Sequence, residues 1–187
     1  MMPPLYAKGS TVVATLEFLR ADGGADTLWA VLQALPADLR GRLVAAEPTA
    51  ELAYDDLVAL WREADTALAL SDPKWMERAG GFSIESSGVQ MYGGLLRKAT
   101  PEQFLTQSVS LFRLYYHPGD MIVVEQHDRS AVLRLVGFDA RTPLFCRRQT
   151  GGLLAALTIA GGASAEVHHV RCALDGDAWC EWALSWK

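Results

Sequence analysis

The sequence predicts an α+β domain, in which an antiparallel sheet of about four strands is covered on one face by helices. Up to residue 116, apolar residues recur at the spacing of amphipathic helices. Residues 120–138 and 163–186 each hold two β-rich runs joined by a short turn, which is typical of hairpins. A helical pattern at 143–162 separates them. We expect a single domain over residues 1–187, with a helical part at about 9–117 and a hairpin-helix-hairpin part at about 118–187.

Length and composition limit the classes of function. A chain of 187 residues, 50% hydrophobic and 21% charged, suits one soluble domain. The net charge of −5 and scattered Lys and Arg argue against nucleic-acid binding. No apolar run reaches the roughly 20 residues that span a membrane. The first ten residues lack the features of a secretory signal, so we expect a cytoplasmic location.

The helical segments have recognisable ends. Ser10 is a candidate N-cap, and Gly23-Gly24 is a candidate stop before a second helix that ends ahead of Pro36. Thr100-Pro101 is a helix start, with a capping hydroxyl and a proline at the first position. The segments predicted to be helical in this part are residues 10–24, 25–35, 37–46, 54–70 and 100–116.

A glycine-rich stretch lies at residues 79–96 and holds five glycines. A phosphate-binding loop would need a Lys-Ser or Lys-Thr pair after the glycines, and none follows. We therefore expect a mobile or kinked connection between helices here.

The three cysteines suggest a metal site. Thiols stay reduced in the cytoplasm, so a disulfide framework is not expected. A turn at residues 174–177 brings Cys172 and Cys180 close, and His169 precedes Cys172 by three residues. Three thiolates and one imidazole suit a tetrahedral structural zinc. The candidate ligands are Cys146, His169, Cys172 and Cys180.

Other interpretations of the cysteines stay open. Buried free cysteines are common in cores. Strict alternation places His169 and Cys172 on opposite faces of a strand, so a shared site requires the strand to end or bulge first. Cys172 and Cys180 could instead form a redox pair across the turn, and His168 could replace His169 as the ligand.

The C-terminal motifs resemble a known domain. "GGLLAAL", "GGASAEVHHVRC" and "GDAWCEWALSW" occur in that order, with "LQALPADLR", "LVALWREAD" and "ATPEQFLTQSVSLFRLYYHPGD" upstream. Together they resemble the 4-vinyl reductase domain superfamily, and more closely an uncharacterised paralogous family of myxobacterial proteins built on that domain. The superfamily includes phenol-sensor domains, Golgi tethering (TRAPP) subunits and a haem domain that senses nitric oxide.

The resemblance implies a fold of helices packed on an antiparallel sheet, often dimeric. Its aromatic-sensing members hold zinc with an upstream cysteine, an acid and two cysteines flanking the last turn. Cys146, Cys172 and Cys180 fall at matching places, and His169 stands at the position of the acid. The haem branch uses a Tyr-x-Ser-x-Arg signature that this sequence lacks, and His117 is expected to cap a helix. We therefore expect zinc and no haem.

The resemblance favours a non-catalytic sensory or ligand-binding domain for a small apolar or aromatic molecule. No nucleophile-base motif is present, so we expect no enzyme. An alternative is a homodimeric adaptor for a protein partner, with an exposed apolar face at Leu28, Trp29 and Leu32. Candidate pocket residues, which are core residues in the competing interpretation, are Trp61, Trp75, Met91, Tyr92, Phe112, Tyr115 and Tyr116.

Overall fold

The structure is a computed structural model that describes residues 4–90, 93 and 100–187, with the backbone alone at 107–111. The helices are α1 (Gly9–Ala34), α2 (Ala37–Val44), α3 (Tyr54–Leu68), α4 (Trp75–Ser83), the π-helical turn η1 (Ile84–Gly88), α6 (Pro101–Tyr115), α7 (Pro143–Ile159) and the 3₁₀ turn η2 (Ala173–Asp175). The strands are β1 (Tyr6–Lys8), β2 (Glu51–Ala53), β3 (Tyr116–His117), β4 (Asp120–His127), β5 (Ser130–Val136), β6 (Glu166–Arg171) and β7 (Glu181–Ser185).

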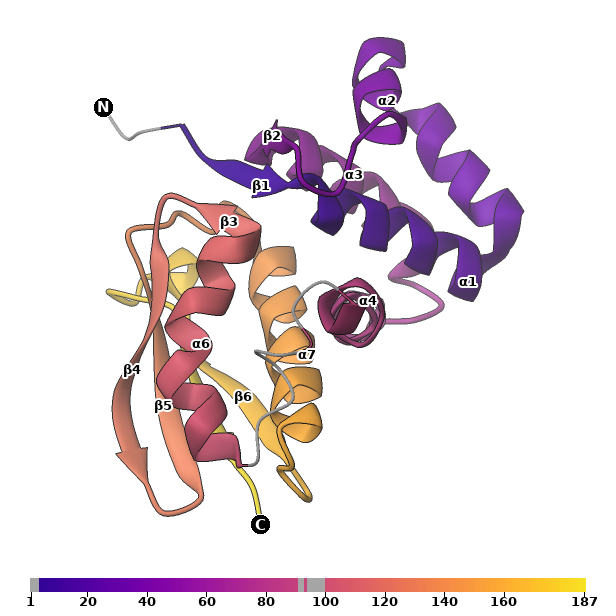
Figure 1. Ribbon diagram of the computed structural model, residues 1–187. Coiled ribbons are helices and arrows are strands. Elements are labelled where there is room, and N and C mark those ends of the chain that lie inside the picture. The colour runs from indigo at the N-terminus through magenta and orange to yellow at the C-terminus, as the bar shows by residue number, and fades with distance from the viewer. Residues whose placement is uncertain (1–3, 91–92, 94–99) are drawn as a thin grey trace.

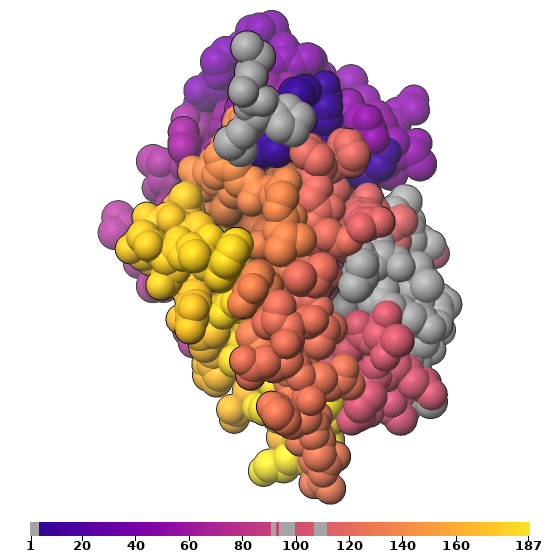
Figure 2. All heavy atoms as spheres, turned by 90° about the vertical axis from the view of Figure 1, so that its left-hand side faces the viewer, coloured from indigo at the N-terminus to yellow at the C-terminus, as the bar shows by residue number. Residues whose placement is uncertain are grey.

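The larger sheet is antiparallel, with the strand order β4-β5-β7-β6. Helices α6 and α7 lie against one face of it (Figure 1). Figure 2 views the molecule from the side of β4 and β5, whose hairpin runs down the centre with the C-terminal segment beside it. The prediction of an α+β fold with an antiparallel sheet and helices is therefore confirmed.

A smaller sheet, with the order β2-β1-β3, joins the start of the chain to the end of α6. This sheet was not predicted from the sequence. Each of its strands has two or three residues, too few to show an alternating pattern. His117 lies on β3, exposed and paired with Tyr6, so the prediction that it caps a helix is wrong.

The predicted N-cap at Ser10 is wrong, because α1 begins at Gly9 with Lys8 before it, but the signals at Gly24 and at the start of α6 predicted well. Gly24 interrupts α1 with a φ of 81°, where the sequence predicted a stop. The Thr100 hydroxyl accepts a hydrogen bond from the backbone N–H of Gln103, and Pro101 occupies the first turn of α6. Both features follow from local backbone chemistry.

The glycine-rich segment differs from its prediction. Its described part forms α4 and η1, so residues 79–88 are helical and are not a connection between helices. A Cβ on Gly80 would lie 2.1 Å from the Arg148 carbonyl oxygen, and one on Gly151 would lie 1.8 Å from that of Glu77. These glycines therefore let α4 and α7 approach backbone to backbone.

The core is continuous between the helical part and the sheet. The buried face of α3 holds the predicted residues Leu57, Leu60, Trp61, Ala64 and Leu68. Tyr54 and Tyr116 join an aromatic cluster with Phe112, Phe138 and Phe145. In the part of the chain that the structure describes, no helix combines the length and apolarity needed to cross a membrane.

Candidate functional site

Four potential metal ligands gather at the C-terminal end of the fold. One ligand atom from each of Cys146, His169, Cys172 and Cys180 lies within 4.8 Å of the others. All three cysteines are free and buried, and the Cys146 and Cys180 sulfurs are 3.8 Å apart. The predicted ligand set is thus brought together in space, with soft donors that suit a thiophilic metal ion.

An irregularity in β6 lets His169 and Cys172 point toward the same cluster. The pairing register with β7 shifts between His169 and Arg171, which leaves Val170 as an extra, exposed residue. The predicted bulge therefore exists, and it brings His169 and Cys172 to the same site. His168 points away, exposed and 3.6 Å from Glu166, so His169 is the histidine of the cluster.

The cluster has a distinct electrostatic environment. A hydrogen bond from the Cys146 thiol, helped by His169, lowers the pKa of Cys180 to about 4. The same contact, together with burial, raises the pKa of Cys146. The imidazole stacks on Trp182 at 4.8 Å, and its Nε2 has no hydrogen-bond partner among the described residues. An available imidazole nitrogen beside a thiolate can coordinate a metal.

The loop after β6 fixes the two C-terminal cysteines. The Cys172 N–H donates to the Asp177 carboxylate at 2.8 Å, and the Ala173 N–H donates to the Cys180 sulfur at 3.4 Å. Asp177 thus forms part of the turn, as its sequence context predicted. The hydrogen-bonded thiol pair is Cys146 with Cys180, whereas the redox alternative paired Cys172 with Cys180.

A second site is a cavity of about 70 Å³ between the helical part and the sheet. Its wall is mainly apolar, with Phe104, Phe112 and Leu153 among its residues. The polar side chains of the wall include those of Thr11 on α1 and Arg148 on α7. The cavity therefore lies where four helices and the strands β3 and β4 meet.

Arg148 is the unexpected member of this wall. It is one of the scattered basic residues of the sequence, next to Arg147. It lies on the face of α7 that carries Phe145 and Gly152, at helical spacing, and this face packs inward. A charged residue on an otherwise apolar helical face was the signal that could have identified it.

The structure places the predicted pocket residues in different parts of the molecule. Phe112, Tyr115 and Tyr116 line the cavity, and their role in ligand binding stays a prediction. Trp61 lies outside the lining, with its ring centroid 5.5 Å from the Arg148 guanidinium carbon. Trp75 is buried elsewhere and donates to Asp65. Met91 and Tyr92 lie outside the described residues.

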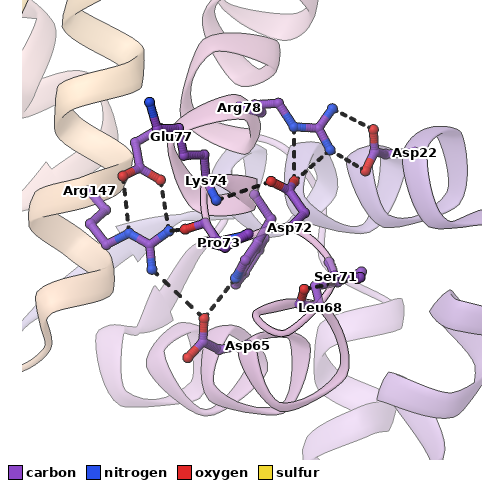
Figure 3. Close-up of polar contacts among 11 residues, drawn as sticks. Asp22, Asp65, Leu68, Ser71, Asp72, Pro73, Lys74, Glu77, Arg78 and Arg147 are labelled. Atoms are coloured by element: carbon purple, nitrogen blue, oxygen red, sulfur yellow. Dashed lines mark hydrogen bonds and ion pairs between the residues drawn. The ribbon is translucent and has the colours of Figure 1, made fainter.

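A polar network beside α7 holds the helices around the cavity (Figure 3). Arg147 donates to both oxygens of Glu77, at 3.1 and 2.9 Å, and also to the Pro73 carbonyl oxygen. Arg78 forms two bonds with Asp22, at 2.7 and 2.6 Å. These pairs tie α7 to α4 and α4 to α1, so we assign them a structural role.

Comparisons with known proteins identify the fold. No protein-family model and no curated sequence matches the chain. Its structure matches the H-NOX protein of S. oneidensis in the Fe(II)NO state (TM-score 0.74, 14% identity, 96% of this chain and 99% of that one). It also matches the unliganded Fe(II) H-NOX protein of K. algicida (0.73, 13%, 96% of both) and an oxygen-binding H-NOX domain related to soluble guanylate cyclases (0.68, 13%, 96% and 95%).

These matches correct the family resemblance. The similar structures reported above are H-NOX domains, so the assignment to the 4-vinyl reductase type or to Golgi tethering subunits is wrong, and with it the adaptor role. The motifs that suggested it are short and lie on separate elements, such as "GGLLAAL" on α7 and "CEWALSW" over β7, whereas the structural match extends over 96% of the chain. At 13–14% identity the match establishes the fold alone.

The cofactor predictions are corrected in the same way. The similar structures include ones described with heme or Fe(II), which contradicts the prediction of no haem, and no finding shows zinc here. The residues of this chain decide whether haem fits. All four histidines are described, and none lines the cavity, which is also far smaller than the roughly 300–1,000 Å³ of drug-sized pockets. As described, these residues do not fit haem, and we assign it no step.

Proposed function

We propose that this chain is a sensory ligand-binding domain built on the H-NOX fold. The observation that carries the proposal is the apolar cavity between the helical part and the sheet. Concave apolar sites with a few polar groups are where proteins bind small molecules. The similar structures include an oxygen-binding domain and a nitric-oxide complex, which supports a small ligand.

The position of the cavity supports a sensory role. Its wall draws residues from α1, α4, α6 and α7, which pack on one another and on the sheet. An occupant would therefore contact every element that joins the two parts of the chain. A ligand that favours one packing of these helices would shift the population of that packing, which is the basis of a sensory response.

A thermal-shift screen tests this function. The probes are small apolar and aromatic compounds, short organic acids and haemin, measured on wild type, Ala156→Leu and Leu154→Ala. Ala156 is buried in the cavity wall, so leucine fills the space, whereas Leu154 is 39% exposed on the same helix. We expect a bound probe at 100 times its Kd to stabilise wild type and Leu154→Ala by about 2.7 kcal/mol, with no effect on Ala156→Leu. Equal shifts in all three proteins, or no shift with any probe, would contradict the proposal.

We further propose that Cys146, His169, Cys172 and Cys180 bind one metal ion. The proposal is supported by their mutual distances and by the unpartnered Nε2 of His169. Elemental analysis of protein purified without added metal should find about one equivalent of a thiophilic metal. Cys172→Ser/Cys180→Ser protein should contain none. Metal-free wild type that keeps its thermal stability after metal addition would contradict the proposal.

Three predictions remain for other experiments: a non-enzymatic protein, a cytoplasmic location and a homodimer. For the homodimer, only Trp29 of the predicted apolar face is exposed, at 64%, because Leu28 is buried and Leu32 is half-buried. Light scattering with size-exclusion chromatography should give twice the monomer mass for wild type and a lower mass for Trp29→Ser. A monomeric wild type would contradict the dimer.

A further inference from the structure

Arg148 places a positive charge in the cavity wall without a matching negative charge. The residue is 4% exposed, and both of its terminal nitrogens, Nη1 and Nη2, lack a hydrogen-bond partner among the described residues. Burial lowers the pKa of Arg148, and the nearby Tyr116 hydroxyl opposes that change. An arginine remains charged even so, so the cavity contains a cation.

No carboxylate of this chain neutralises it. All 22 acidic residues lie in the part of the chain that the structure describes, and none forms an ion pair with Arg148. None of them lines the cavity either. The Trp61 ring, 5.5 Å from the guanidinium carbon, offers a cation–π contact that offsets part of the desolvation. A buried charge without a partner is strongly destabilising, which points to an anion supplied from outside.

A second polar group stands in the same wall. The Thr11 hydroxyl is buried, lines the cavity and has no hydrogen-bond partner among the described residues. A guanidinium fork with a neighbouring hydroxyl matches the two oxygens of a carboxylate. The remaining wall includes Phe104, Phe112 and Leu153, which would surround an apolar body. The cavity thus offers a guanidinium and a hydroxyl in a mainly apolar wall.

We propose that the cavity binds a short-chain organic acid as its anion, with the carboxylate held by Arg148 and Thr11. This inference rests on the proposed function, because it takes the cavity as the ligand site. The size of the cavity limits the ligand. One water-sized group occupies roughly 10–15 Å³, so a cavity of about 70 Å³ holds about five or six heavy atoms. Isobutyrate has this size and a branched apolar body.

Calorimetric titration with isobutyrate and its neutral isostere isobutyramide tests the charge requirement. We expect wild type to bind isobutyrate at least about tenfold more tightly than the amide, because a bond from arginine to a carboxylate is charge-assisted. Arg148→Met should lose this preference. The control Arg62→Met, on the exposed face of α3, should keep it. Wild type that binds acid and amide equally, or binds chloride as tightly as isobutyrate, would overturn the inference.

Two further variants guard against misfolding and locate the carboxylate. Arg148→Lys keeps the charge without the fork and should retain part of the preference. Thr11→Val removes one hydroxyl and should weaken isobutyrate binding about tenfold with little effect on the amide. A Thr11→Val protein with unchanged isobutyrate affinity would argue against the placement. Neutral compounds that bind wild type but not Ala156→Leu, with no binding of acids, would refute this inference and leave the proposed function intact. If no probe binds at all, both fail.

Discussion

Helix α7 carries two buried polar sites that contrast with each other. At Cys146 the chain itself supplies the surroundings, with two more thiols and an imidazole within 4.8 Å. At Arg148, two residues further, the chain supplies a cation and no counter-charge. Residues two apart on a helix point in nearly opposite directions, so the two sites share a helix and no contact surface. In our proposals the first site binds a metal ion and the second binds an organic anion.

This difference shows how the partners of a buried group indicate its role. A set of groups that converge on one point is organised by the fold, so its occupant is small and fixed by donor chemistry. A charge that the fold leaves unmatched is tolerated only if something else compensates. The comparison can be tested by changing the contact of α7 with α4, and then each site in turn.

The largest effect should come from the contact of α7 with α4. Gly151→Ala would place a Cβ against the Glu77 carbonyl oxygen and should lower the free energy of unfolding by about 3 kcal/mol. Gly152→Ala is the matched control, because its nearest neighbour is 3.6 Å away, and helix propensity should raise stability by up to about 1 kcal/mol. Urea unfolding measures both. Equal effects would mean that the backbone approach at Gly151 does not limit packing.

The next effect concerns the cluster of thiols. His169→Ala removes a ligand and should weaken metal binding by at least about 10-fold, measured by competition with a chelating dye. The control His168→Ala alters the neighbouring exposed residue and should leave the affinity unchanged. If His168→Ala weakened metal binding and His169→Ala did not, His168 rather than His169 would be the ligand.

Adjacent arginines should respond with opposite signs. Arg147 is paired with Glu77 and half-buried, so Arg147→Met should cost roughly 1–2 kcal/mol after allowance for solvent screening. Arg148→Met removes an unmatched charge and should raise the stability of the ligand-free protein by roughly 1–2 kcal/mol. Thermal unfolding without ligand measures both changes. Destabilisation by Arg148→Met would show that the chain does compensate the charge.

The smallest effect should come from an exposed ion pair. The hydrogen bond from Lys8 lowers the pKa of Glu51 below 4.5, the value of a free glutamate. A lowered folded-state pKa gives stability that is present above the unfolded pKa and is lost as pH falls through the folded one. Below about pH 4.5 the stability of wild type should therefore decline slightly more steeply than that of Glu51→Gln. Parallel pH profiles would remove any role for this pair.

The features predicted from sequence are those with local causes. The buried face of α3, the Thr100 cap and the bulge required before Cys172 each depend on residues close in sequence. The gathering of the four candidate ligands could be predicted because three of them flank a single strand end and turn. The fold family could not be predicted, because it depends on how α1, α6 and α7 pack relative to the sheet of order β4-β5-β7-β6. The cavity could not be predicted for the same reason, since only tertiary packing places Thr11 and Arg148 in one cavity wall.

The bulge at Val170 also affects how related sites can be recognised in other sequences. In an unbroken strand, a histidine and a cysteine on one face are separated by an odd number of residues. The spacing His169-x-x-Cys172 violates that rule and works only because one residue is inserted. A pattern search for this cluster must therefore use the bulged spacing. An alignment that treats Val170 as a regular strand residue would hide the site.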